Sequence, residues 1–264
     1  MAYVIVLIIG LAASAVGTII GIGGGVIIKP VMDAVLDMSV VQISFISGCT
    51  VLAMSAVSFA RNVKQKERLD IKKSTVLAVG GAVGGVAGKA IFDIATKTME
   101  SSDIVGAVQS TIMVVMTAGV FIYTCFKDRI RSRNVKSPVV SFAIGGALGV
   151  MSAFLGIGGG PINIAILVYC FSMDSKTAAA NSLYIILFSQ LASLITTAVT
   201  GAIPEFSPAF LVLMMGGGAA GALIGGAVSG KLRSRHVDKV FLVLLAVIIA
   251  ISIYNIFNFV ALAS

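Results

Sequence analysis

The stretch "GIGGGVIIKP" at residues 21–30 interrupts one apolar run, and "GIGGGPINIA" at residues 156–165 interrupts another in the same way. Glycine destabilises a helix interior, so these clusters end a helix rather than continue it. The apolar segments that follow, 26–36 and 161–173, are too short to cross a bilayer alone, which takes about 20 residues. The sequence therefore predicts two helices that break inside a membrane.

The composition of the whole chain also indicates a membrane protein. Of its 264 residues, 58% are hydrophobic and 11% are charged, whereas a soluble domain carries roughly 25% charged residues. Residues 1–20 lack the basic start of a signal peptide and have a counterpart in the second half, so we interpret them as a membrane helix. We expect ten apolar segments, at approximately 3–20, 26–36, 43–60, 74–92, 104–126, 138–155, 161–173, 178–199, 207–229 and 240–262.

A self-comparison shows an internal repeat. At a shift of 135 positions, the five residues from Gly21 match the five from Gly156, and Ser47 matches Ser182, without a gap. Self-similarity at a fixed shift is typical of repeated structural units. We therefore predict a first repeat at 1–134 and a second at 135–264, within a single membrane domain.

The distribution of positive charge predicts how the repeats are oriented. Three loops carry 15 of the 19 lysines and arginines: 61–73, 127–136 and 231–239. The loops 93–103 and 200–206 hold only Lys97 between them. The positive-inside rule places the three basic loops in the cytoplasm, and both termini are then extracytoplasmic in a multi-pass protein of the cell (inner) membrane. Residues 138–173 must then begin and end inside and 3–36 outside, so the repeats are inverted.

The expected fold class is therefore an all-α integral membrane protein with two inverted-topology repeats. Each repeat is a Gly-broken helical hairpin followed by three transmembrane helices, which gives about eight full spans if each hairpin counts as one.

A helix break of this kind can bind an anion. It leaves free N–H groups at the start of the next half-helix, where the positive end of the helix dipole lies. Unsatisfied backbone at membrane depth must be buried in protein or line a cavity, so we expect the two breaks to converge on one central site. Close helix packing is the competing interpretation, and it explains "GGAVGG" (80–85) and "GGGAAGALIGG" (216–226). The candidate donors are Gly23, Gly24, Gly25, Gly158, Gly159 and Gly160.

Polar residues inside the spans are further candidates for substrate binding. For each hydroxyl the alternative is a bond to its own helix backbone. Lys29 could supply positive charge to an anion; the alternatives are a pair with Asp33 at i+4 or a side chain that snorkels to the surface. The other candidates are Ser47, Thr50, Asn181, Ser182 and Gln190.

Several classes of function are disfavoured. The net charge of +8 is concentrated between apolar spans, which suits loops beside anionic lipid rather than nucleic acid. The three cysteines show no CxxC spacing and the single histidine, His236, lies in a basic loop, so we expect no metal site and no cofactor. The spans contain no catalytic constellation and the loops no nucleotide-binding motif, which argues against an enzyme and against an ATP-driven pump.

The breaks, Pro30 after the first, and the segments "SFISGCT" (44–50) and "AAANSLY" (178–184) resemble the TauE/SafE sulfite-exporter family over essentially the whole chain. The resemblance implies a secondary transporter of a sulfur oxyanion or organosulfonate, such as sulfite, sulfoacetate or thiosulfate. Lys29, and a proline at 161 rather than near 165, depart from the family pattern. An anion channel and a transporter of small carboxylates remain alternatives. The expected partners are a small anion, the bilayer, a coupling ion (proton or sodium) and a second copy in a homodimer.

Overall fold

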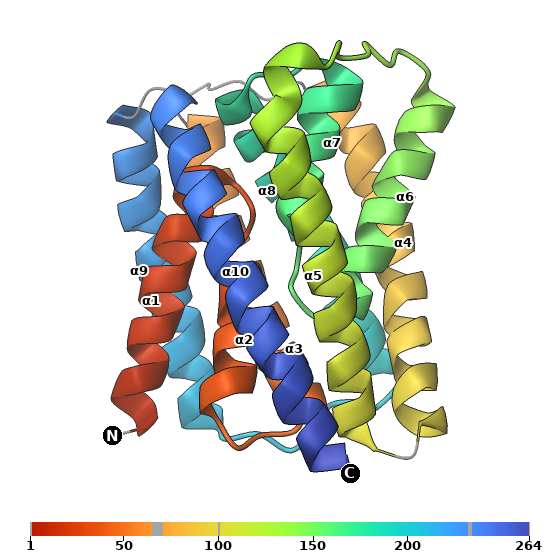
Figure 1. The fold of residues 1–264 in the computed structure, drawn as a ribbon, viewed down its shortest axis with the longest axis vertical. Helices are drawn as coiled ribbons and strands as arrows, with labels where there is room; N and C mark the ends of the chain where they lie inside the picture. Colours follow the sequence, from red (N-terminus) through yellow and green to blue (C-terminus); the bar gives the residue numbers. More distant parts are fainter. Residues whose placement is uncertain (1, 65–70, 100, 232–233, 264) are drawn as a thin grey trace.

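The computed structural model describes residues 2–64, 71–99, 101–231 and 234–263, and over these residues the chain is helical throughout, without a strand (Figure 1). Ten α-helices and one short 3-10 helix follow in this order: α1 (Ala2–Ile20), α2 (Gly25–Val35), α3 (Val40–Lys64), α4 (Ile71–Thr98), α5 (Ser102–Phe126), η1 (Lys127–Arg129), α6 (Pro138–Phe154), α7 (Pro161–Phe171), α8 (Ser175–Val199), α9 (Pro208–Lys231) and α10 (Ser234–Ala263).

The long helices have the dimensions of membrane spans. Among the described residues, seven helices are long and apolar enough to cross a bilayer, while α6 and α7 are shorter apolar helices. Large apolar side chains are exposed along the sides of the bundle, for example Val243 and Phe257 of α10. These features confirm the predicted all-α, multi-pass integral membrane protein.

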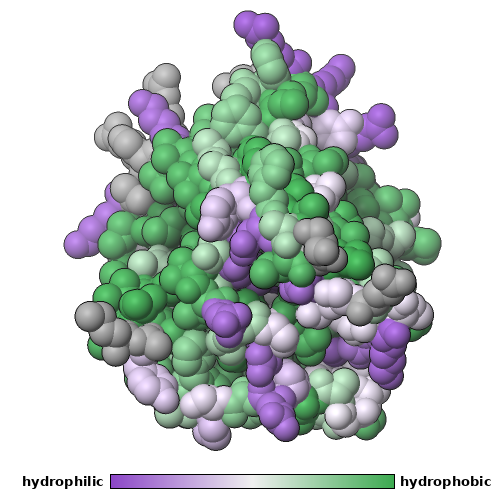
Figure 2. All heavy atoms as spheres, turned by 60° about the horizontal axis from the view of Figure 1, so that its bottom comes forward, coloured by the Kyte–Doolittle hydropathy of each residue, from purple (hydrophilic) through white to green (hydrophobic). Residues whose placement is uncertain are grey.

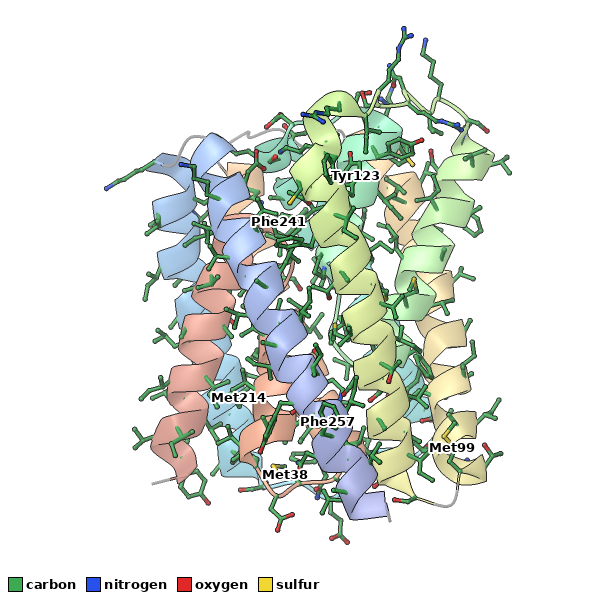
Figure 3. All side chains as sticks on the ribbon, in the orientation of Figure 1. Met38, Met99, Tyr123, Met214, Phe241 and Phe257 are labelled. Carbon is green, nitrogen blue, oxygen red and sulfur yellow. The ribbon has the colours of Figure 1, made fainter. Side chains whose placement is uncertain are left out.

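The connections divide between two ends of the bundle. Helices α3, α5 and α9 end, and α4, α6 and α10 begin, at one end, and both chain termini lie at the other (Figure 1). We call these the basic-loop end and the terminal end. Nitrogen-tipped side chains project from the basic-loop end (Figure 3). Part of the predicted basic loops, residues 65–70 and 232–233 with Lys66, Arg68 and Arg233, lies outside the described residues.

The two broken hairpins enter the bundle from opposite ends. Helix α1 starts at the terminal end, and α2 returns to that end (Figure 1). Helix α6 starts at the basic-loop end, and α7 returns there, where the N–H of Arg133 donates to the Tyr169 carbonyl at 2.7 Å. These directions agree with the predicted inverted repeats; the repeats and their division at residues 134 and 135 stay predictions.

Glycine stripes hold the first helix of each hairpin against a long neighbour. A Cβ built on Gly84 of α4 would overlap the Gly146 carbonyl of α6, and one on Gly221 of α9 would overlap the Leu11 carbonyl of α1. Backbones approach this closely only where a side chain is missing. Gly84 in 80–85 and Gly221 in 216–226 therefore serve helix packing, the role that the sequence predicts for these two stretches.

Apolar side chains fill the interior of the bundle over its whole length. Figure 3 shows this filling from Phe241 near the basic-loop end to Met38 near the terminal end. Ile22 and Ile157, the isoleucines of the two GIGGG clusters, belong to one buried cluster. The breaks are therefore enclosed by protein, which is the condition for irregular backbone at membrane depth.

Candidate functional site

Each break begins with the same type of helix cap. Gly21 and Gly156 have left-handed φ angles of 85° and 65°, which glycine adopts without a steric penalty. The N–H of Ile22 donates to the Gly17 carbonyl at 3.1 Å, and the corresponding bond at the second break measures 3.3 Å. This is the six-to-one bond of a Schellman cap. The first glycine of each cluster therefore ends α1 and α6.

Pro161 makes the two breaks different. Helix α2 begins at Gly25, whereas α7 begins at Pro161, one position later in the repeat register. Proline disfavours a helical conformation in the preceding residue, and Gly160 is extended, with φ −155° and ψ 178°. Pro161 also has no N–H, while the N–H of Gly24 already lies 2.9 Å from the Met54 sulfur. The six predicted glycines therefore do not offer six equivalent donors.

The two breaks touch inside the bundle. A Cβ built on Gly25 would overlap the carbonyl oxygen of Ile157, so the backbone of the first break lies directly against the second. Residues 21–25 and 156–160 are all buried. In the described part of the chain, no protein acceptor takes the N–H of Gly23 or of Gly158. The breaks that the sequence predicts to converge are thus brought together.

Helices α3 and α8 cover the breaks in a reciprocal way. Gly156 of the second break lies against Ser44 of α3, and Gly21 of the first break lies against Ala179 of α8. Both members of the second pair are offset by 135 positions from their counterparts in the first. Two equivalent repeats that face each other would produce this exchange of partners.

Ser47 and Ser182 lie on the two faces that cover the breaks. Ser47 is one turn from Ser44 and one turn from Val51, which both contact the second break. Ser182 lies likewise between the two residues of α8 that contact the first break. Both serines are 0% exposed, and neither hydroxyl has a hydrogen-bond partner in the described part of the chain. Such groups are costly in a folded protein unless something else binds them.

Gln190 also reaches the second break. Its Nε2 lies 3.0 Å from the position that a Cβ on Gly158 would take, and the residue is 3% exposed. Asn163 of α7 was not predicted but lies beside the same break, with Nδ2 3.5 Å from a Cβ position on Gly159. The Asn163 Oδ1 is buried without a partner among the described residues. Two amide side chains therefore flank the second break.

Thr50 and Asn181, both predicted site residues, have partners within the protein. The Thr50 hydroxyl donates to the Ile46 carbonyl at 2.8 Å, the local helix bond that was its alternative interpretation. The Asn181 amide donates to the Thr177 carbonyl at 2.6 Å, and its Oδ1 accepts a bond from Ser74 of α4. In this conformation the hydrogen bonds of Thr50 and Asn181 stabilise the helices and are not directed at the breaks.

Lys29 lies one turn after Gly25, in a small cavity that residues of α5 and α10 also line. Its ammonium group is 2.8 Å from a carboxylate oxygen of Asp33, so the predicted pair is present. The residue is 2% exposed. The interpretation of Lys29 as a snorkelling side chain is therefore wrong, because its short helix keeps it inside the bundle.

A cavity of about 90 Å³ lies near the basic-loop end. We call it the basic vestibule. Ala179, which contacts Gly21 of the first break, forms part of its wall. Its polar lining consists of Thr18, Arg61, Asn62, Lys176 and Ser229.

A second cavity of about 30 Å³ lies near the terminal end. We call it the terminal vestibule. It includes Gly156, the first glycine of the second break, together with Ser44, Lys89, Gln190 and Ser193. Figure 2, which brings the bottom of Figure 1 forward, shows polar residues in the middle of this face between apolar sides.

The two vestibules are built from corresponding positions of the chain. Several residues in one have their partner in the other at the shift of 135: Thr18 and Ala153, Val41 and Lys176, Ser44 and Ala179, Gly48 and Leu183. The terminal vestibule includes Gly156 of the second break, and the basic vestibule includes Ala179, which contacts Gly21 of the first.

The vestibules differ in charge. In the terminal vestibule, Lys89 is neutralised by Asp93 at 2.7 Å. In the basic vestibule, the Nη1 of Arg61 is buried without a hydrogen-bond partner, and neither Arg61 nor Lys176 forms an ion pair among the described residues. Aspartate and glutamate are absent from the described lining of both cavities. The arrangement therefore favours a small anion.

Sequence reasoning missed Arg61, Lys176 and Asn163 as candidates for the site. Arg61 was counted only as a loop charge, and Lys176 is 115 positions away in the chain, so no local pattern joins them. Asn163 follows the second break by three residues and could have been found as a polar residue in an apolar segment. No group of three metal-binding side chains lies together in the described part of the chain.

The fold and the site define a polytopic α-helical membrane protein of the transporter type, in which broken helices meet between cavities from opposite ends. The family model described as "Sulfite exporter TauE/SafE" matches residues 6–252. The chain therefore belongs to this family of membrane transporters. It is also 21% identical over 265 residues to the "Probable membrane transporter protein YunE" of Bacillus subtilis (strain 168), covering 94% of this chain and 96% of the relative. No solved structure matches the chain significantly.

Proposed function

We propose that this protein is a secondary transporter of a small anion, a sulfur oxyanion or organosulfonate such as sulfite, thiosulfate or sulfoacetate, which binds where the two breaks meet. One observation carries the proposal. The backbone of Gly25 lies against Ile157, with Gly156 of the second break in the wall of the terminal vestibule and Ala179, the neighbour of Gly21, in the wall of the basic vestibule. A substrate that moves from one vestibule to the other must pass this contact.

The chemistry of the path supports an anion. Unbound N–H groups of Gly23 and Gly158, the amide of Gln190 and the hydroxyls of Ser47 and Ser182 are all donors. An anion accepts several such bonds at once, and bonds to a charged acceptor are the stronger ones. Sulfur oxyanions present several acceptor oxygens around one atom, which suits donors that arrive from both repeats.

The closed contact between the vestibules supports a carrier rather than an open pore. Val51 and Ile186 belong to one buried apolar cluster beside the breaks. One water molecule needs a cavity of about 10–15 Å³. The basic vestibule, at about 90 Å³, therefore has room for a small anion, and the terminal vestibule, at about 30 Å³, has room for little more than water. We propose that the two hairpins move apart alternately toward each end, as equivalent repeats 1–134 and 135–264 would allow.

The orientation follows from the same proposal. With the basic-loop end in the cytoplasm by the positive-inside rule, both termini are extracytoplasmic, and the basic vestibule receives cytoplasmic anions. A vestibule with two unneutralised cations on the cytoplasmic side would concentrate anions there.

A binding screen with purified protein tests the proposed substrate class. Sulfite, thiosulfate and sulfoacetate should raise the unfolding temperature, because a ligand that binds the folded state stabilises it. Acetate should raise it less, since its single carboxylate reaches fewer donors. If carboxylates raised the unfolding temperature more than the sulfur compounds do, the substrate would be a small carboxylate instead. In liposomes, counterflow should be observed; flux without saturation or counterflow would indicate a channel instead.

A matched pair of glycine variants tests the location of the site. In Gly25→Ala the added methyl would overlap the Ile157 carbonyl and force the breaks apart, an overpacking that costs about 1–3 kcal/mol. We expect this variant to lose most of the stabilisation by anion. Gly216→Ala places its methyl where nothing lies within 4 Å and should bind like the wild type. Wild-type binding in a folded Gly25→Ala protein would contradict a site at the junction.

A further inference from the structure

A second polar cluster lies on α2, one turn beyond the first break and outside both vestibules. It contains the Lys29–Asp33 pair, whose side chains are each 3% exposed. The surrounding cavity of about 10 Å³ is lined also by Gln109 and Ser110 of α5, by Ser252 of α10 and by Leu155 at the end of α6. Ionisable residues inside a membrane span are expensive and are by default candidates for a function.

Several oxygens in this cluster have no hydrogen-bond donor. Within the described part of the chain, the Asp33 Oδ1, the Gln109 Oε1 and the Ser252 Oγ are all buried without a partner. The residues are 8%, 2% and 1% exposed. A carboxylate oxygen and an amide oxygen are acceptors only, and the Ser252 hydroxyl can donate to one of them at most. A proton on Asp33 would turn its carboxylate into a donor for the Gln109 oxygen.

We infer that Asp33 is the proton-binding site that couples anion movement to a proton gradient; the inference rests on the proposed transport function. When Asp33 takes up a proton, its carboxylate becomes a carboxylic acid, and the new O–H can donate to Gln109 or Ser252 in the same cavity. The neutral ion pair then becomes a site of net charge +1 on Lys29, because the protein supplies no second counter-ion.

The charged groups around the pair are few. Helix α1 contains no acidic or basic residue. Arg61 of α3 lies near the C-terminus of α3, at the basic-loop end of the bundle. Helices α5 and α10 line the cavity with neutral side chains only. Asn255 of α10 is neutral as well; it donates to the Pro30 carbonyl at 2.9 Å and ties α10 to α2.

The anion proposed at the break is the counter-charge that Lys29 then lacks. Gly25 and Lys29 are four residues apart on one helix, about 6 Å along its axis. Proton binding at Asp33 and anion binding at the break therefore favour each other, and binding linkage is reciprocal. The predicted mode is symport of the anion with a proton, both carried by α2.

Proton uptake on anion binding tests the inference directly. Thiosulfate is the probe, because it has no proton of its own to release near neutral pH. Its addition to purified protein in weak buffer should bind close to one proton per anion in the wild type. Asp33→Asn should still be stabilised by thiosulfate but take up no proton. The double variant Lys29→Gln, Asp33→Asn removes both buried charges and serves if the single variant does not fold.

The chain contains a matched control for the pair. Lys89 and Asp93 have the same spacing and a similar distance of 2.7 Å, but Asp93 has a side chain that is 20% exposed. Asp93→Asn should keep the proton uptake of the wild type. Equal loss in Asp93→Asn and Asp33→Asn would overturn the assignment to Asp33.

The outcomes separate the two proposals. Stabilisation by thiosulfate without proton uptake in the wild type would overturn the proton site alone. No stabilisation by any anion in the screen would count against the proposed function, and the proton site would fall with it. In liposomes, a pH gradient should drive accumulation in the wild type and not in Asp33→Asn. If a sodium gradient drives it instead, and choline cannot replace sodium, the proton is the wrong ion.

Discussion

Replacing Ser47 or Ser182 with alanine should weaken anion binding without weakening the fold. Both hydroxyls are fully buried and lack a partner in the described part of the chain, so the folded protein gains no hydrogen bond from them. If they exist to bind substrate, their bonds form only when the anion is present. A substitution at either position should therefore change the affinity for the anion without lowering the stability of the fold.

The magnitudes follow from the state of each hydroxyl. Leaving a buried hydroxyl unpaired costs about 1–3 kcal/mol, so removing it should leave the free energy of unfolding unchanged or higher. A hydrogen bond to a charged acceptor contributes about 1.5–3 kcal/mol, so its loss should lower the affinity tenfold or more. The two effects have opposite signs.

The assay is the unfolding temperature of each variant, first without anion and then with increasing sulfite. The temperature without anion reports the fold, and its rise with sulfite gives the affinity. Ser58→Ala is the control in α3, because the Ser58 hydroxyl already donates to the Met54 carbonyl of its own helix at 2.8 Å. If both Ser47→Ala and Ser182→Ala bind sulfite like the wild type, these faces of α3 and α8 do not form the site.

Two further predictions concern packing and charge. Gly84→Val should lower the unfolding temperature, because its side chain would collide with the Gly146 carbonyl. Sulfite should still stabilise the folded fraction of this variant. Loss of that stabilisation would show that the α4 glycines belong to the site. Arg61→Gln combined with Lys176→Gln should lower sulfite affinity about tenfold at low salt and less at high salt, because salt screens the attraction between charges. Lys97→Gln, at the terminal end, is the control. An equal loss of affinity in Lys97→Gln would contradict a local role of the basic vestibule.

Most of the fold could be predicted from the sequence because hydrophobic length and glycine clusters are local signals. The predicted segment 138–155 is observed as Pro138–Phe154, and 161–173 as Pro161–Phe171. The largest differences occur where a helix continues past the apolar run. Helix α10 starts at Ser234 rather than near 240, because charged residues at a membrane surface can remain helical while they lower the local hydropathy.

The site could be predicted only in part, because the rotation of a helix about its axis is a tertiary property. Ser47 and Thr50 both lie on α3, but one has no partner and the other bonds to its own backbone. Helical spacing places both on related faces and cannot separate them. The meeting of Arg61 and Lys176 in one cavity likewise depends on how α3 and α8 pack, which no local pattern encodes.

The two repeats share their breaks, which are proposed to bind the anion, but they differ in the ion pair that is proposed to couple the anion to a proton. Equivalent breaks can present the same anion to either side, but two identical halves would provide no reason for a fixed number of coupled protons. Lys29 corresponds to Ile164 at the shift of 135, so the ion pair on α2 has no counterpart on α7. If Asp33 is the proton site, one protein chain carries one such site for the single anion that its two breaks share. A stoichiometry of two protons per anion would therefore require a second titratable group outside α2 and would show that the asymmetry of the repeats does not set the coupling.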